Sequence, residues 1–329
     1  MIRIFINGFG RIGRSAARII LGDDRFELVG INDLCSFEQM EYLLKFDSLY
    51  GKLPNNIKLK QNILNIDEKE IELFSQPQPK KLNLKHLNVD VVLECSGMFL
   101  SVEDNRAFVE NGAKRVLVSA PASDDMPTYI YGVNHEEYKD EEIISNSSCS
   151  TNAIVPIFKI IDEHFGIKSA MMSMYHSYTS YQNLLDGKHH SKDIRRTRSA
   201  TLNIIPIMSS AAKATEVFFP KLKDKLHAKS IRVPIPSTTL YELNIKLSNS
   251  YTAAEVNNKI KEAVKGQYKN ILDVTTKPEE SDNYIENPYS AVINLPFTTV
   301  SGNLLRVSAW QDNEYGYAKR LVDMALFIA

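Results

Sequence analysis

The feature that most constrains the fold of this chain is the stretch Gly8 to Gly13, which spaces three glycines as Gly-x-Gly-x-x-Gly. An alternating apolar run over residues 2–6 precedes it, as in a short buried strand, and a helical apolar period follows it. A second apolar run over residues 26–31 leads to Asp33, which lies 20 residues after the last glycine. This order of strand, glycine turn, helix, strand and acid predicts a Rossmann-type half-site for a dinucleotide.

The three glycines and the acid each have a physical reason to be there. Gly8 permits the tight turn, Gly10 lets the backbone approach a pyrophosphate, and Gly13 lets the helix pack closely on the strand. The pyrophosphate would lie at the N-terminus of the helix. Asp33 would accept hydrogen bonds from the ribose hydroxyls and would repel a 2′-phosphate, which favours NAD over NADP.

Strand and helix patterns keep alternating through the first half of the chain. A helical pattern covers residues 102–111, and buried strand patterns cover residues 89–95, 115–119, 129–133 and 142–145. Repeated alternation predicts a mainly parallel, doubly wound α/β sheet whose ligand binds at the carboxyl ends of the strands. Asp33, Ser119 and Cys149 all follow such predicted strand ends.

Cys149 stands where a predicted strand gives way to a helix, in the stretch Ser145 to Asn152. Free backbone N–H groups and the positive end of the helix dipole stabilise an anion at such a point, so we expect this thiol to ionise easily. Its neighbours Ser148 and Ser150 are small, leave room for a ligand, and can donate hydrogen bonds to it.

The second half of the chain predicts an α+β domain with a mixed, mostly antiparallel sheet. Long strand patterns with few intervening helices cover residues 169–179, 240–247, 289–295 and 304–310. His176 shares a strand face with Met172 and Met174 by two-residue alternation. A histidine among apolar neighbours is more often structural than catalytic, but the polar residues that follow place His176 near a strand end.

Two basic features are candidate anion sites. Residues 188–198 hold five lysine and arginine side chains against the single acid Asp193. A solvated loop, a phosphate pocket, a subunit contact and a nucleic-acid patch are all open interpretations, and nucleic acid is the least favoured because no aromatic residues are interleaved. Arg232 lies inside an apolar strand pattern, where an arginine needs an anionic partner, so it is the better candidate.

Composition excludes several classes of protein. A length of 329 residues favours two domains, and a net charge of -1 gives no field that would draw the chain to nucleic acid or to an anionic membrane. The sequence shows no signal peptide and no apolar run of the roughly 18 residues that a spanning helix needs. Three widely spaced cysteines favour reduced thiols in the cytoplasm, and no residues have metal-ligand spacing, so we expect no metal.

Six stretches of the sequence, taken together, are specific enough to indicate a protein family. They are, in chain order, Ile6 to Arg14, Leu44 to Ser48, Ser145 to Asn152, His176 to Thr179, Arg232 to Pro234 and Asp312 to Tyr317. Together they make the chain resemble the phosphorylating (type I) glyceraldehyde-3-phosphate dehydrogenase family over nearly its whole length. The resemblance implies NAD-dependent oxidation of glyceraldehyde 3-phosphate with inorganic phosphate to 1,3-bisphosphoglycerate, a step of glycolysis and gluconeogenesis.

The resemblance also implies a role for each matching position. Cys149 would be the nucleophile that forms a thiohemiacetal and then a thioester, and His176 would be the base. The positions implied for NAD are Gly8, Gly10, Arg11, Ile12, Gly13, Asp33, Ser119 and Asn313. The positions implied for substrate are Ser148, Ser150, Thr179, Ser209, Ser210, Arg232 and Arg196, although the choice between Arg195 and Arg196 at the phosphate pocket stays open.

At the level of the whole chain, the resemblance implies two domains and an oligomer. The NAD-binding domain would cover residues 1–148, with the C-terminal helix 313–329 packing back on it, and the catalytic domain would cover residues 149–312. Four identical subunits would associate around the loop from Ser180 to Thr201, which would make the basic run partly structural.

The sequence departs from the family mainly near the phosphate sites. Ser210 stands where the family usually has a glycine, and Tyr181 where it often has an aspartate. These departures keep two alternatives open. One is an erythrose-4-phosphate dehydrogenase, in which water releases the acid, and the other is an NAD-binding sensor or scaffold with little catalysis.

Overall fold

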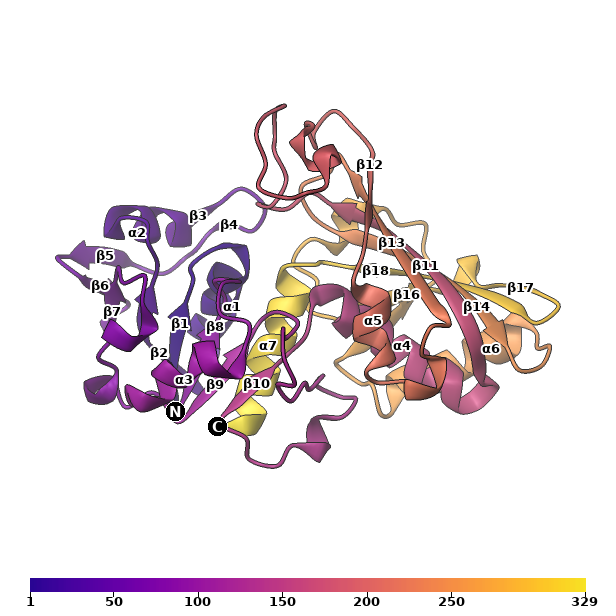
Figure 1. The fold of residues 1–329 in the computed structure, drawn as a ribbon, viewed down its shortest axis with the longest axis horizontal. Helices are drawn as coiled ribbons and strands as arrows, with labels where there is room; N and C mark the ends of the chain where they lie inside the picture. Colours follow the sequence, from indigo (N-terminus) through magenta and orange to yellow (C-terminus); the bar gives the residue numbers. More distant parts are fainter. The chain divides into compact units, whose positions relative to one another are not determined.

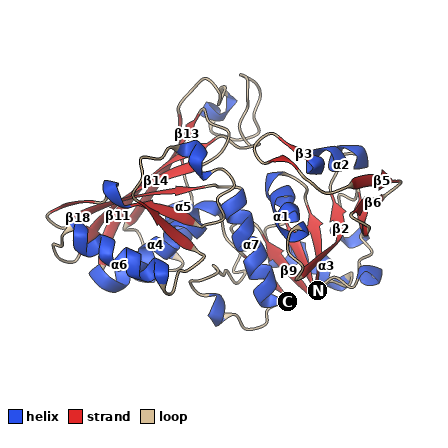
Figure 2. Ribbon diagram, turned by 180° about the vertical axis from the view of Figure 1, so that it is seen from behind, coloured by secondary structure: helices blue, strands red, loops and turns tan.

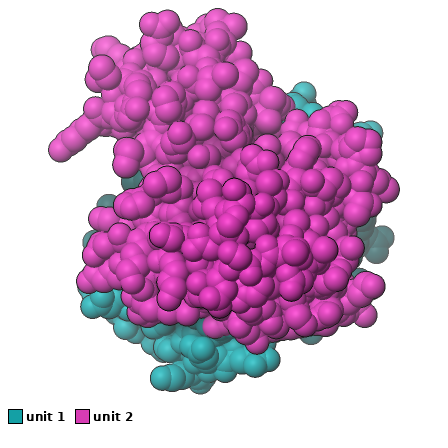
Figure 3. All heavy atoms as spheres, turned by 90° about the vertical axis from the view of Figure 1, so that its right-hand side faces the viewer, with its two compact units in different colours: residues 1–148, 318–329 teal, residues 149–317 magenta.

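The computed structural model describes all 329 residues, which divide into two compact units. Unit 1 comprises Met1–Ser148 and Ala318–Ala329, and unit 2 comprises Cys149–Tyr317 (Figure 3). The α-helices are α1 (Arg11–Leu21), α2 (Phe37–Lys45), α3 (Val102–Glu110), α4 (Cys149–Phe165), α5 (Ala211–Glu216), α6 (Ala253–Lys265) and α7 (Tyr315–Ile328). None of them combines the length and the apolar character that crossing a membrane requires.

Unit 1 is built on a sheet with the strand order β10-β9-β8-β1-β2-β7-β6-β5 (Figure 1). Its strands are β1 (Ile2–Asn7), β2 (Phe26–Asn32), β5 (Ile57–Lys60), β6 (Ile63–Ile66), β7 (Lys69–Phe74), β8 (Val91–Glu94), β9 (Arg115–Val118) and β10 (Ile143–Ser145). Neighbours from β10 to β7 are parallel, and β6 and β5 continue antiparallel. The predicted doubly wound, mainly parallel sheet is therefore confirmed. A separate short hairpin joins β3 (Phe46–Asp47) and β4 (Gly51–Lys52).

Both faces of this sheet are buried, because successive residues of a strand point to opposite sides and the residues on both sides are apolar. Ile4 and Ile6 of β1 pack in one apolar cluster that also contains residues of α1 and of α7. Phe5, between them, belongs to the cluster on the other face, where Phe108 of α3 packs. Because these strands are apolar on both sides, helices must cover both faces of the sheet to keep them from water.

The strand predicted at residues 129–133 is wrong. This segment forms a turn, and only Thr128 makes a single bridge, with Ser145. Asn134 accepts a hydrogen bond from the backbone N–H of Ile130, and the N–H of Val133 bonds back to Ile130 O. Local partners thus satisfy the backbone groups that a sheet would otherwise have taken.

Unit 2 holds a mixed sheet with the order β12-β13-β11-β14-β18-β16-β15, and β17 pairs with β18. Its strands are β11 (Ile167–Ser177), β12 (Ile205–Met208), β13 (Leu226–Val233), β14 (Thr239–Leu247), β15 (Leu272–Thr275), β16 (Ala291–Asn294), β17 (Thr299–Ser301) and β18 (Leu304–Gln311). Only the β11–β13 and β15–β16 pairs are parallel, which confirms the predicted mostly antiparallel sheet. Helices α4, α5 and α6 lie against one side of it (Figure 2).

Candidate active site

Cys149 is the first residue of α4. Strand β10 ends at Ser145, and Ser147 then takes a positive φ of 56°. The hydroxyl of Ser145 accepts a hydrogen bond from the N–H of Ser147 (2.9 Å) and so fixes this turn. The thiol therefore stands at a helix N-terminus, as expected.

His176, near the end of β11, faces this thiol. Its Nε2 lies 4.0 Å from Cys149 Sγ. The imidazole is 4% exposed and shares its buried face with Met172 and Met174, as the alternation predicted. Burial, and then the positive charge of Arg232, lowers the pKa of His176 to about 3, so the ring is neutral in the ligand-free protein.

The ease of ionisation predicted for Cys149 is wrong for the ligand-free protein. Burial raises the pKa of Cys149, and the charge of Arg232 and hydrogen bonds with Ser150 oppose this effect without overcoming it. Desolvation of the thiolate outweighs the helix terminus and the nearby cation. A ligand or cofactor that alters the charge around the thiol would shift this balance.

Arg232 contacts the imidazole directly because β13 runs parallel to β11 with Arg232 opposite His176. Its Nη1 lies 2.6 Å from His176 Nδ1 and 3.0 Å from Ser177 O. His176 Nδ1 is also 2.7 Å from Ser177 O. The predicted nucleophile, base and buried arginine thus form one group within unit 2.

Four polar residues that the sequence reading missed support this group. The side chain of Gln311 donates to Cys149 O (3.1 Å) and accepts from the hydroxyl of Tyr241 (2.7 Å). Ser177 donates to Asn313 Oδ1 (2.9 Å), and Thr239 also approaches this oxygen (3.4 Å). These contacts fix the orientation of Asn313, which the resemblance assigned to NAD. No local motif distinguishes such residues from other buried polar residues of a strand.

The glycine turn of unit 1 has the close packing that the motif predicts. Gly8 has a φ of +93°, and a Cβ on it would lie 2.4 Å from Ser96 N. A Cβ on Gly13 would lie 2.1 Å from Gly8 O. A Cβ on Gly10 would meet no protein atom within 4 Å, and α1 begins after Gly10 without a side-chain cap. An open, uncapped helix start fits the pyrophosphate of NAD.

Four further residues implied for NAD, Asp33, Ser119, Ile12 and Arg11, belong to unit 1, whereas Asn313 belongs to unit 2. Asp33 accepts hydrogen bonds from the N–H groups of Phe9 (2.6 Å) and Cys35 (3.0 Å), so the acid is fixed beside the glycine turn. Ser119 follows β9, and its N–H donates to Glu94 O (2.9 Å). Ile12 packs on the apolar cluster that contains α1. The guanidinium of Arg11 pairs with Asp47.

A buried network that the sequence reading also missed joins the strand ends below the turn. The Nδ2 group of Asn7 donates to Glu94, and that of Asn32 donates to Asn7 Oδ1 (2.6 Å). Glu94 also accepts from the N–H of Ser96 (2.7 Å), whose backbone contacts Gly8. Burial raises the pKa of Glu94 to about 7, although these hydrogen bonds act in the opposite direction.

The remaining residues implied for substrate divide into two sets. The first set adjoins the nucleophile: Ser150 hydrogen bonds with the thiol of Cys149, and Ser148 is the residue before Cys149 in the chain. Thr179, Ser209 and Ser210 bond locally, to Gln182, Ala211 and Ala214 respectively. Ser210 has a φ of -78°, so no glycine is required at this position.

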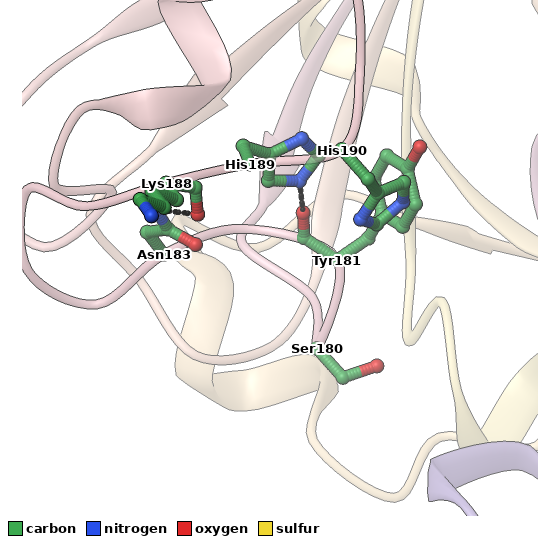
Figure 4. A pocket seen from close by; sticks show the side chains of 6 residues that line it. All are labelled: Ser180, Tyr181, Asn183, Lys188, His189 and His190. Carbon is green, nitrogen blue, oxygen red and sulfur yellow. Dashed lines mark hydrogen bonds between the residues drawn. The ribbon is translucent and has the colours of Figure 1, made fainter.

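Arg196 and Arg195, between which the sequence did not decide, have different environments. Arg195 is exposed and forms an ion pair with Asp193. Arg196 is half-buried, and its guanidinium lies over the ring of Tyr181. Tyr181 itself lines a surface pocket with Ser180, Asn183, Lys188, His189 and His190 (Figure 4).

A dinucleotide-binding sheet in one unit and a thiol–imidazole–guanidinium group in the other define an NAD-dependent oxidoreductase that carries a candidate thiol nucleophile. Comparison with known proteins gives the family. Residues 2–102 match the family model described as glyceraldehyde 3-phosphate dehydrogenase, NAD binding domain, and residues 148–313 match its C-terminal domain. The chain belongs to the glyceraldehyde-3-phosphate dehydrogenase family.

Similar proteins extend over the whole chain. A glyceraldehyde-3-phosphate dehydrogenase of Priestia megaterium is 41% identical over 331 residues, which cover 100% of this chain and 98% of the relative. Glyceraldehyde-3-phosphate dehydrogenase 1 of Bacillus subtilis is 40% identical with the same coverage. A glyceraldehyde-3-phosphate dehydrogenase of Haloarcula vallismortis is 38% identical over 99% of this chain and 98% of its own.

Proposed function

We propose that the protein catalyses the NAD-dependent oxidation of glyceraldehyde 3-phosphate, with inorganic phosphate, to 1,3-bisphosphoglycerate in glycolysis and gluconeogenesis. The observation that carries the proposal is the approach of Cys149 Sγ to His176 Nε2 at 4.0 Å, with Arg232 beside the same imidazole. A thiolate is a good nucleophile and a good leaving group from a thioester, and an imidazole at this distance can transfer the proton.

In the proposed reaction, Cys149 Sγ attacks the aldehyde carbon as the thiol proton passes to His176 Nε2, and this proton then goes to the carbonyl oxygen to give a thiohemiacetal. When bound, NAD would accept the hydride that leaves this former aldehyde carbon. His176 takes the hydroxyl proton as the C–H electron pair leaves, and a thioester on Cys149 results. A phosphate oxygen then attacks the thioester carbon, the C–S bond breaks, and the thiolate is restored as the acyl phosphate leaves.

The contacts at His176 Nδ1 give Arg232 a further part in this reaction. A guanidinium only donates hydrogen bonds, so at 2.6 Å it favours the imidazole tautomer that carries its proton on Nε2. That tautomer cannot accept a proton from the substrate at Nε2. An anionic group that draws Arg232 away would let Nδ1 donate to Ser177 O, already 2.7 Å distant, and leave Nε2 free as the base.

We place this enzyme in the cytoplasm and infer a homotetramer. Three free cysteines are typical of a reducing compartment. Several large apolar side chains of residues 180–208 are exposed, among them Leu185 (75%), Ile194 (80%) and Met208 (80%). Apolar side chains gathered on one segment support association with identical subunits through it.

Formation of NADH tests the proposed function. Purified protein, NAD and glyceraldehyde 3-phosphate should give NADH at a rate that rises with inorganic phosphate and saturates. Cys149→Ala should lower the rate by at least about 10³-fold, because the covalent route is lost, and should still bind NAD in a calorimetric titration. Absence of phosphate-dependent NADH formation in the unmodified protein would refute the proposal.

Erythrose 4-phosphate in place of the three-carbon aldehyde extends the test. We expect the larger kcat/KM for glyceraldehyde 3-phosphate. A preference for the four-carbon sugar, with turnover independent of phosphate, would reassign the enzyme to the alternative reaction.

A further inference from the structure

A row of buried side chains crosses the sheet of unit 2 on the face that carries the imidazole. His176 of β11 pairs with Thr239 of β14, and Thr239 pairs in turn with Gln311 of β18. Residues directly opposite one another in neighbouring strands point to the same face of a sheet. Helix α4, which begins with Cys149, packs against β11 (Figure 2). Gln311 therefore lies two strands from His176 and on the same face, where it reaches the start of α4.

The amide of Gln311 has one orientation that satisfies both of its ends. Its Nε2 donates to the carbonyl oxygen of Cys149 (3.1 Å), an atom that can only accept a hydrogen bond. Its Oε1 then faces Tyr241, whose hydroxyl donates to it (2.7 Å). Tyr241 is 0% exposed and Gln311 is 1% exposed, so water does not compete for either hydrogen bond.

The register of the two strands explains how Tyr241 reaches this amide. Tyr241 stands opposite the small residue Ala309 and is two positions along β14 from Thr239, which stands opposite Gln311. Diagonal neighbours of this kind are about 7–8 Å apart, within reach of an aromatic side chain. The hydroxyl of Tyr241 also lies 3.5 Å from Oγ of Ser150, the second residue of α4. Gln311 and Tyr241 together thus anchor the first turn of α4 to β14 and β18.

A contact with the carbonyl of Cys149 acts on the position of its thiol, because one residue carries both groups. A carbonyl in the first turn of a helix accepts from the N–H four residues later and has a second lone pair, which Gln311 occupies. The thiol Sγ lies 4.0 Å from His176 Nε2. Since proton transfer needs hydrogen-bond reach, this separation leaves little room for further movement before the two groups lose contact.

We propose that Gln311 is a positioning residue for the nucleophile, which holds the first turn of α4 so that Cys149 and His176 stay aligned, and that Tyr241 fixes its amide for this task. The inference rests on the proposed function, because it concerns the same thiol and imidazole. Gln311 exchanges no proton or electron pair with the substrate. Its loss should therefore slow the steps at Cys149 without weakening the binding of substrate or cofactor.

Gln311→Met removes the donor and keeps a side chain of similar length. It should lower kcat for NADH formation from glyceraldehyde 3-phosphate by about 10- to 100-fold, the order of loss expected when a reacting group is displaced by about 1 Å. KM for the aldehyde and Kd for NAD should stay within about twofold of their values in the unmodified protein. A higher KM with an unchanged kcat would overturn the inference.

Gln311→Glu makes the same test dependent on pH. A protonated carboxyl can donate to Cys149 O and accept from Tyr241, as the amide does, whereas a carboxylate can only accept. The ratio of kcat in this variant to kcat in the unmodified protein should therefore fall as the pH rises and the new carboxyl ionises. The same ratio for Gln311→Met should not vary with pH. Equal losses in the two variants at every pH would contradict the donor role.

Alkylation by iodoacetamide, with mass spectrometry of the peptide that contains Cys149, probes the alignment without turnover. Gln311→Met should lower the alkylation rate at neutral pH by about tenfold, because the N–H of a displaced imidazole stabilises the thiolate less. An unchanged rate would overturn the inference. The reaction needs neither NAD nor aldehyde, so a protein that alkylates as expected but forms no NADH refutes the proposed function alone.

Two further variants separate alignment from a general loss of stability. Ser308→Ala removes a buried hydrogen bond to Glu242 (2.6 Å) on the other face of β18, and it should keep kcat and the alkylation rate within about twofold. Tyr241→Phe should lower kcat by about three- to tenfold, and it should cause no further loss in a Gln311→Met background. Additive losses would overturn the role given to Tyr241. Circular dichroism of each variant shows whether it is folded.

Discussion

At the scale of single residues, the candidate site is governed by desolvation. Burial raises the pKa of Cys149 and lowers that of His176, so both groups are neutral in the ligand-free protein. An ion pair between them would need compensation for the burial of two charges. Arg232 favours the thiolate and disfavours the imidazolium, so its position decides how far the pair can ionise.

Asp33 provides a prediction about the choice of cofactor. Asp33→Gly should lower the ratio of kcat/KM for NAD to that for NADP by about tenfold or more, because a carboxylate beside the glycine turn repels a 2′-phosphate. Steady-state kinetics with both cofactors measure the ratio. Asp33→Asn, which removes the charge and keeps the shape, should shift it in the same direction. An unchanged ratio in both variants would show that another residue discriminates between the cofactors.

The sequence identified the residues with distinctive chemistry more easily than the residues that hold them. Cys149 could be selected because a thiol at a predicted helix start has distinctive chemistry, whereas the role of His176 as the base follows from the family resemblance. Gln311 and Tyr241, which support Cys149, lie in strands where any buried polar residue would look alike. The pKa of Cys149 could not be predicted, because the depth of burial depends on the tertiary fold.

At the scale of elements, three strand ends of unit 1 are joined by the side chains of Asn7, Asn32 and Glu94. The carboxyl of Glu94 lies at the end of β8, under the turn that Gly8 forms against Ser96. The geometry of the glycine turn therefore depends on the protonation of Glu94, a residue that is not among those implied to bind the nucleotide.

Glu94→Gln should change how stability depends on pH. The pKa of Glu94 is about 7 in the folded chain and about 4.5 in the unfolded chain, so the folded state holds the proton more tightly. The free energy of unfolding should therefore fall by up to about 3 kcal/mol between pH 4.5 and 7 in the unmodified protein. Urea unfolding at several pH values should show this loss only when Glu94 is present.

The control for this prediction is Glu70→Gln, at an exposed position of β7. It should leave the pH dependence of unfolding unchanged. A constant difference between the unmodified protein and Glu94→Gln across this pH range would contradict the assignment.

Elements with strong apolar periods were predictable, and polar or short elements were not. The unit β1–α1–β2 follows from the glycine motif and its flanking strands. The strands β5, β6 and β7 escaped prediction because each is only four to six residues long. The segment 129–133 looked like a strand by composition, but the side chain of Asn134 and local backbone bonds make it a turn.

At the scale of the whole molecule, the exposed apolar side chains of unit 2 predict an oligomer that charge can disrupt. Ile194→Asp should dissociate the proposed tetramer, because a buried carboxylate without a partner is costly. Sedimentation velocity should show a smaller mass at micromolar concentration. Tyr42→Asp, at an exposed site on α2 of unit 1, should leave the mass unchanged. An unmodified protein that sediments as a monomer would refute the tetramer.

The kinds of sheet were predictable at this scale, but the strand order within each sheet was not. Periodicity shows that a strand is buried, not which strand lies beside it. β1 pairs with β8 across more than 80 residues of sequence, and β11 lies between β13 and β14. Pairings between strands that are distant in sequence depend on how the connecting helices cover the two faces of the sheet. A local sequence pattern does not contain this information.

The division of α7 between the units has a consequence for synthesis. Ala318, Leu321 and Met324 of this helix fill the apolar cluster against Ile4 and Ile6, yet they follow all of unit 2 in the chain. On the ribosome, the first strands must wait while Cys149–Tyr317 is made, roughly 10–30 s at ordinary rates. During that time a nascent nucleotide-binding unit keeps an uncovered apolar face, which is the surface that a chaperone would recognise.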